Sequence, residues 1–168
     1  KDRVSEVIEL LRERLAAVKV GDPSREDVTM GPVSTAQQLR DVREGVKKLE
    51  SCAKIVFGKT TDVEAIGVPA NKGFFVTPVL LHGAEPKPGD AVHSHEVFGP
   101  VATVMPYESA AQAVTLVAAG GGGLVTSVYS DDKDFTRTMV MGIAPFHGRL
   151  VLGSSKIAGQ SLPPGMAL

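Results

Sequence analysis

The chain has 168 residues, of which 43% are hydrophobic and 22% carry charge, and its formal net charge is -1. This composition is typical of a globular domain with a sizeable core, and the near-neutral charge argues against a binding surface for nucleic acid or an anionic membrane. No apolar run is long enough for a transmembrane helix, and the single cysteine, Cys52, excludes an intrachain disulfide and fits a reducing, cytoplasmic setting.

Two segments near the start of the chain have apolar residues at helical spacing. They predict a first helix over residues 4–18 and a second over 34–49. Ser34 and Gln37 have the S-x-x-Q spacing of a capping box, which favours a helix start at Ser34. The short apolar run at 53–57 then predicts a strand.

The middle of the chain is predicted to be mostly irregular, with one strand. Residues 59–72 show no clear period and are interpreted as a loop. Residues 74–81 are rich in strand-forming side chains, but Pro78 cannot donate a ladder hydrogen bond. This strand is therefore expected at a sheet edge, or with a break at the proline. Residues 82–96 are again interpreted as a loop.

From residue 101 onward, predicted strands and helices alternate. Ser109 and either Asp131 or Asp132 are the expected N-caps of the two helices, and Gly142 is expected to end the second. The order strand-helix-strand-helix-strand predicts an α/β fold, a three-layer open and mainly parallel sheet with right-handed crossover helices. The predicted strands cover 101–105, 124–129 and 149–152, and the predicted helices cover 109–119 and 131–141.

The two ends of the sequence suggest a piece of a longer protein. The chain begins with Lys1 and enters a helical pattern almost at once, and residues 159–168 predict irregular chain without a closing element. We expect a single domain, 1–168, that forms part of a longer protein. A trimmed or mature chain is the alternative.

The four glycines at 120–123 could suggest a phosphate-binding loop. Such a loop needs a strand, then the glycines, then a helix whose N-terminal amides face the phosphate. Here the predicted order is helix, glycines, strand. The glycines are therefore interpreted as the turn that ends the helix.

The remaining candidates for catalysis or metal binding carry less weight. Cys52 follows a helix C-terminus, where the field does not activate a thiol, so a bland, partly buried cysteine is favoured over a nucleophile. His93 and His95 could form a metal pair, but the only further histidines are His82 and His147, and a solvated loop is favoured. No catalytic residue and no metal ligand is assigned.

The segment H-E-V-F-G-P at 95–100 is the most informative part of the sequence. A carboxylate at Glu96 could accept hydrogen bonds from both hydroxyls of a ribose, and the Phe98 ring could pack against a flat heterocycle. Glycine and proline would fix the turn that aims both side chains. The alternative is an ordinary loop glutamate beside a core phenylalanine.

This segment resembles the E-x-F-G-P motif of the aldehyde dehydrogenase superfamily. Three further stretches resemble motifs of the same family, in the same order and at matching spacing over the whole chain. They are V-G-D-P with M-G-P-V at 20–23 and 30–33, the G-F-F-containing stretch at 72–80, and G-L-V-T-S-V-Y-S at 123–130. Residues 91–106 and 147–150 resemble one branch, the bifunctional phenylacetate-degradation proteins, in which the dehydrogenase is fused to an enoyl-CoA hydratase domain.

The resemblance implies an enzyme that uses NADP or NAD. In this family a cysteine attacks the aldehyde, hydride passes to the nicotinamide, and a thioester is hydrolysed to the acid. Glu96 would hold the nicotinamide ribose and Phe98 would pack near the nicotinamide, which positions the cofactor for hydride transfer. In the branch the substrate is a CoA-linked semialdehyde from ring opening. The family nucleophile would precede Lys1, and Cys52 does not align with it.

Three consequences follow from that resemblance. The isolated chain is expected to be inactive and to hold no bound cofactor. It is also expected to self-associate, because family members are commonly homo-oligomers and a separated part of the fold would expose apolar faces. The alternative function is a non-catalytic interaction or oligomerisation module that reuses the fold.

Overall fold

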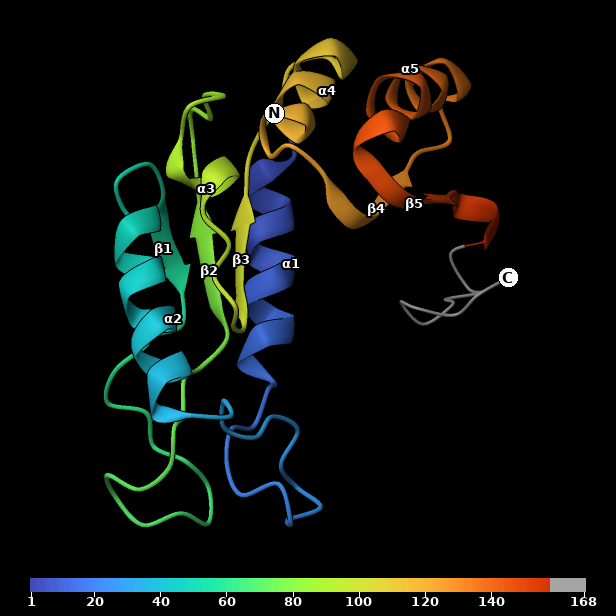
Figure 1. The fold of residues 1–168 in the computed structure, drawn as a ribbon. Helices are drawn as coiled ribbons and strands as arrows, with labels where there is room; N and C mark the ends of the chain where they lie inside the picture. Colours follow the sequence, from blue (N-terminus) through green and yellow to red (C-terminus); the bar gives the residue numbers. More distant parts are fainter. Residues whose placement is uncertain (158–168) are drawn as a thin grey trace. The chain divides into compact units, whose positions relative to one another are not determined.

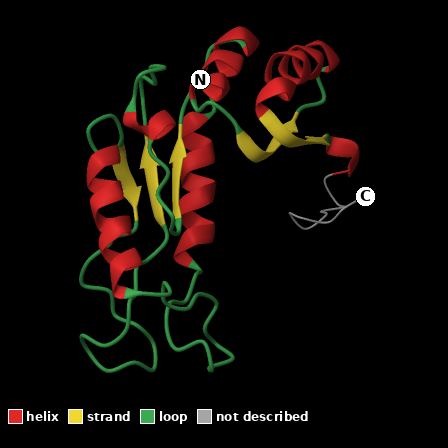
Figure 2. Cartoon of the chain, viewed as in Figure 1, coloured by secondary structure: helices red, strands yellow, loops and turns green. Residues whose placement is uncertain are grey.

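The computed structural model describes residues 1–157 in two compact units, Lys1–Pro106 and the chain from Tyr107 onward (Figure 1). Both units combine helices with strands, as the colouring in Figure 2 shows. The α/β class expected from the sequence is therefore confirmed. The single domain over 1–168 stays a prediction, and the stretch 159–168 lies outside the described residues.

The first unit is built on a three-stranded sheet. Its strands are β1 (Lys54–Phe57), β2 (Val79–His82) and β3 (Val101–Val104), in the order β1-β2-β3. β2 pairs with β1 in antiparallel and with β3 in parallel orientation. The pairing of β1 shifts register between Ile55 and Phe57. β2 is therefore the central strand of this sheet.

The position of β2 corrects one of the two expectations for Pro78. The strand predicted over 74–81 starts only at Val79, whose amide donates to Pro100 O at 2.8 Å. The break at the proline is confirmed, because the regular strand begins only after Pro78, which has no N–H to donate. The edge position is wrong, since strands flank β2 on both sides.

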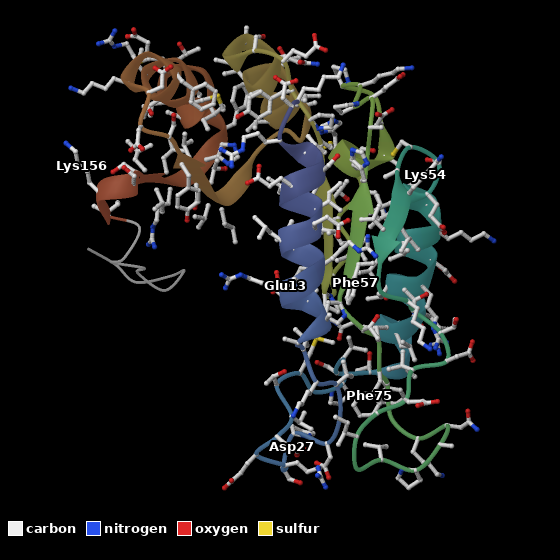
Figure 3. The ribbon with its side chains drawn as sticks, turned by 180° about the vertical axis from the view of Figure 1, so that it is seen from behind. Glu13, Asp27, Lys54, Phe57, Phe75 and Lys156 are labelled. Carbon is white, nitrogen blue, oxygen red and sulfur yellow. The ribbon has the colours of Figure 1, made fainter. Side chains whose placement is uncertain are left out.

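Helices α1 (Val4–Ala16) and α2 (Ala36–Leu49) cover opposite faces of this sheet, as Figures 1 and 3 show from the two sides. Side chains of β2 alternate between the faces. Val79 and Leu81 of β2 point to α2 and form an apolar cluster with it. Burial of this apolar surface holds the helix on the sheet. The buried members are Val42, Val46, Leu49, Ala53, Val76, Val79 and Leu81.

The start of α2 differs by one residue from the predicted capping box. Thr35 is the N-cap, and its hydroxyl accepts from the Gln38 amide at 3.0 Å. Gln38 Oε1 reaches back to the Ser34 amide at 2.9 Å. The predicted pair of Ser34 and Gln37 is wrong because the same chemistry is made by T-x-x-Q, one position further along the chain.

A short helix interrupts the loop predicted over 82–96. This helix, α3, spans Ala91–Ser94 and begins after Asp90. Asp90 Oδ2 accepts from the Lys87 amide at 2.8 Å, and the His95 amide donates to Ala91 O at 2.9 Å. After α3 the chain is extended at His95, which leads it toward β3.

The second unit packs two helices on a pair of parallel strands. β4 (Gly123–Tyr129) and β5 (His147–Gly153) run parallel, as the alternating order of elements predicts. Met139 and Ile143 of α5 (Lys133–Ile143) pack with Ala113 of α4 (Ala110–Ala119) and with Val128 of β4. Within residues 1–157, no helix combines the length and apolarity needed to cross a bilayer. The unit also has 3-10 turns at Ala144–Phe146 and Ser155–Ile157.

The caps of the second unit agree with the sequence in all but one position. The Ser109 hydroxyl accepts from the Gln112 amide at 3.2 Å, and Asp132 rather than Asp131 caps α5. Gly120 is the C-cap of α4, which confirms that the glycine run ends a helix. Gly142 does not end α5, because it lies inside the helix, which continues to Ile143.

Candidate functional site

The candidate cofactor-binding residues lie on the extended segment between α3 and β3. Along this segment, residues 95–99, the side chains alternate in direction, as in a strand. Glu96 is exposed, and 75% of the Phe98 side-chain surface is exposed. Val97 between them is half-buried and packs against the apolar cluster under α2. Glu96 and Phe98 therefore point away from the core, whereas Val97 points into it.

Helix α2 contacts the other side of this segment. Gln38 Nε2 donates to Phe98 O at 3.0 Å. A methyl group added at Gly99 would lie 2.5 Å from Val42 Cγ2, so only glycine fits this close approach. The backbone that carries Glu96 and Phe98 is thus held by one polar contact and by close packing.

The segment is also tied to the sheet. Gly99 donates from its amide to Val97 O at 2.8 Å, which closes a tight turn around Phe98, and Val101 donates to Gly99 O at 2.8 Å, which closes a second around Pro100. Because Pro100 O accepts from the first residue of β2, the segment continues directly into the central pairing of the sheet. The structure therefore provides the rigid turn that the E-x-F-G-P motif predicts.

Glu96 and Phe98 are available to a ligand. Within residues 1–157, the Glu96 carboxylate makes no hydrogen bond or ion pair, so both oxygens can accept. Such an oxygen pair fits the two hydroxyls of a ribose, and an exposed phenyl face fits a flat heterocycle. The structure thus brings a free acceptor and an aromatic ring to the same side of one rigid segment.

The hydrogen bond from Gln38 to the Phe98 carbonyl was not predicted from the sequence. Gln38 lies sixty positions before Phe98 in the chain, and the capping box was assigned to its neighbour Gln37. The T-x-x-Q spacing at Thr35 was the available signal for its local role. Its contact with the Phe98 carbonyl depends on the folded arrangement and has no signature in the sequence.

The V-G-D-P motif has a structural role. The Asp22 carboxylate accepts from the Ser24 amide at 2.9 Å and from the Ser24 hydroxyl at 2.8 Å, and both bonds hold the pKa of that carboxyl below its ordinary value. The Gly21 amide donates to Met30 O at 3.0 Å, which joins the motif to the M-G-P-V stretch. These residues shape a turn remote in sequence from Glu96.

Cys52 and the histidines at 93 and 95 are the other candidates weighed in the sequence. Cys52 is half-buried and its thiol donates to Leu49 O at 3.4 Å, as expected for a structural cysteine. Lys48 Nζ lies 3.4 Å from His95 Nδ1, and His93 Nε2 is buried, so this part of the chain is not simply a solvated loop. No group of three potential metal ligands occurs among the described residues.

Two further features were not expected from the sequence. Thr126 Oγ1 lies 2.7 Å from His147 Nδ1, so a side chain in the middle of β4 contacts the first residue of β5. A groove along α1 is lined by glutamates and by Phe57, and Figure 3 shows Phe57 beside Glu13. Neither Glu96 nor Phe98 lies in its walls, so it is separate from the candidate site.

Comparison with known proteins gives consistent matches. A model described as the aldehyde dehydrogenase family matches residues 1–145. The 3,4-dehydroadipyl-CoA semialdehyde dehydrogenase of Aromatoleum evansii is 41% identical over 88% of this chain and 28% of that protein. Protein MaoC of Klebsiella aerogenes is 34% identical over 83% of this chain and 40% of that protein. The chain thus spans less than half the length of these relatives.

Solved structures agree with the sequence matches. A lactaldehyde dehydrogenase superposes with a TM-score of 0.77 at 26% identity, covering 90% of this chain and 30% of that one. A mutant of aldehyde dehydrogenase C from Pseudomonas syringae, solved with NAD+ and octanal, superposes with a TM-score of 0.74 at 25% identity and covers the same shares. The family model covers most of the residues, and the resemblance seen in the sequence is confirmed: the chain belongs to the aldehyde dehydrogenase family.

Proposed function

We propose that the protein to which this chain belongs oxidises an aldehyde to an acid with NADP or NAD as hydride acceptor. A cysteine outside this chain would form the thioester, and this chain would supply part of the nicotinamide pocket. The observation that carries the proposal is the paired outward presentation of Glu96 and Phe98 on a segment anchored to α2 and to the sheet. Membership of the family and the solved relative with NAD+ support it.

Each of the two residues has a distinct task in this proposal. The Glu96 carboxylate accepts from the hydroxyls of the nicotinamide ribose, and charge-assisted bonds of this kind contribute about 1.5–3 kcal/mol each. The Phe98 ring packs near the nicotinamide and limits its rotation. The bound cofactor supplies the hydride acceptor. Both residues act by positioning, which matters because hydride transfer requires close and aligned reactants.

For the substrate, we propose a CoA-linked semialdehyde of the kind formed by ring opening in phenylacetate degradation. The support is the 41% identity to a relative named 3,4-dehydroadipyl-CoA semialdehyde dehydrogenase. No residue of this chain is assigned to the substrate. The choice of aldehyde can be tested by comparing a CoA-linked semialdehyde with succinate semialdehyde, the substrate named for another relative that is 27% identical.

The first test compares the isolated chain with a chimera. In the chimera, the part of this chain that matches the Aromatoleum evansii relative over 147 residues replaces the corresponding segment of that relative. We expect the isolated chain to show no aldehyde oxidation, because it contributes only the cofactor-positioning residues. We expect the chimera to oxidise a CoA-linked semialdehyde, measured as NADPH or NADH absorbance. Turnover by the isolated chain, or an inert but folded chimera, would contradict the proposal.

We also infer that the isolated chain self-associates. On the two-stranded sheet of the second unit, Leu124 is 88% exposed and Tyr129 is 76% exposed. Parallel strands in proteins are normally covered on both faces, so these apolar side chains favour association. Light scattering should show dimers or larger assemblies, and Leu124→Ser should shift them toward the monomer. A monomer at high concentration would refute the inference. It would also remove the support for an interaction module as the alternative function.

A further inference from the structure

A stripe along α2 faces the segment that carries Glu96 and Phe98. Gln38, Val42 and Gly45 recur at helical spacing and each meets a different part of residues 95–99. Lys48 extends the stripe to His95. The helix therefore follows the segment over its whole length.

Gly45 is the position on this stripe where the segment comes closest. It is buried in the interior of α2, where glycine is a poorer helix former than alanine. A methyl group added there would lie 2.8 Å from Val97 Cγ2 and 3.2 Å from His95 Nε2. Val97 is β-branched and stiff at χ1, so it cannot simply rotate away. α2 thus has glycine, which lowers helix stability, at the position where residues 95–99 approach it too closely for a side chain.

We propose that Gly45 is a positioning residue for the cofactor site. Because Gly45 has no side chain, Val97 can pack close to the helix. The distance between Val97 and the helix then determines how far the side chains of Glu96 and Phe98, the two neighbours of Val97, extend outward from the segment. A side chain at position 45 would push Val97 outward and move both neighbours with it. The inference rests on the proposed function of Glu96 and Phe98. In this inference, α2, which packs against the inner side of the segment, determines where the side chains of Glu96 and Phe98 lie.

The experiment uses the active chimera with Gly45→Ala. We expect the KM for NAD(P)+ to rise by roughly tenfold, because displacements of less than an ångström in a positioned site already cost rate and affinity on this scale. The KM for the aldehyde should stay within about twofold. The second variant, Gly45→Ala with Val97→Ala, makes room for the new methyl group. It should bring the cofactor KM most of the way back, because the two residues are in direct contact.

The outcomes separate this inference from the proposed function. Glu96→Gln is measured in the same chimera. If Glu96→Gln raises the cofactor KM but Gly45→Ala does not, Gly45 has no positioning role. A rise that Val97→Ala fails to relieve also overturns the inference, since the effect then arises elsewhere in α2. If Glu96→Gln itself has no effect, the proposed function fails and the Gly45 inference fails with it.

Discussion

Replacing Glu96 with glutamine in the chimera is expected to raise the KM for NAD(P)+ by about 30- to 150-fold. Glutamine keeps the size of the side chain but offers one neutral acceptor in place of a charged pair of oxygens. Charge-assisted hydrogen bonds are roughly twice as strong as neutral ones, so two ribose bonds would lose about 2–3 kcal/mol together. The measurement is the initial rate as a function of cofactor concentration at saturating aldehyde.

A matched control makes the same chemical change elsewhere. Glu44 lies on α2 and is exposed. Glu44→Gln should leave the cofactor KM within about twofold, because a single exposed charge contributes little. An equal effect of the two substitutions would indicate a loss of general electrostatic attraction. An unchanged KM for Glu96→Gln would contradict the assignment of the ribose contact.

Local chemistry made much of the fold predictable from the sequence. The helices α1 and α2 follow the 3.6-residue spacing of their apolar residues. The starts of α4 and α5 follow the preference of hydroxyl and carboxylate side chains for the unpaired amides at a helix start, as Ser109 and Asp132 show. The capping box at α2 was displaced by one residue because Ser34 and Thr35 are adjacent and chemically equivalent. Only the backbone angles of the folded chain decide which of them caps the helix.

The place of β2 in its sheet could not be predicted in the same way. Pro78 indicates that pairing is interrupted, but whether strands flank the following residues on one side or on both depends on the packing of β1 and β3. The short α3 was also missed, because four residues are too few to show a period.

The candidate site also has a part that the sequence predicts and a part that only the structure shows. Glu96 and Phe98 were found because their motif is local and is supported by other motifs in the same order. The contacts of Gln38 and Gly45 with residues 95–99 join segments about fifty to sixty positions apart, and no spacing rule connects them. Sequence reasoning therefore found the side chains that would face the cofactor, and the structure was needed to find what holds them.

Replacing Leu81 with alanine is expected to lower the free energy of unfolding by about 2–5 kcal/mol. Leu81 lies in the central strand, its side chain is 0% exposed, and it packs in the cluster between the sheet and α2. The substitution removes apolar contacts and leaves a cavity that β1 and β3, on either side, prevent from closing. The measurement is urea unfolding of the chain, with the free energy taken from the midpoint and slope.

Leu10→Ala is the control, since it makes the same change at a leucine of α1 that is 54% exposed. There alanine loses little burial and is the better helix former, so the free energy of unfolding should change by less than about 0.5 kcal/mol.

The two leucine substitutions also test the position of β2 in the sheet. A leucine on an edge strand would keep one side open to water and would allow the cavity to relax, so a loss below about 1 kcal/mol at Leu81 would favour the edge position that Pro78 suggested. A loss in the expected range agrees with the central position of β2, whose first residue, Val79, donates to Pro100 O at the end of the segment that presents Glu96 and Phe98.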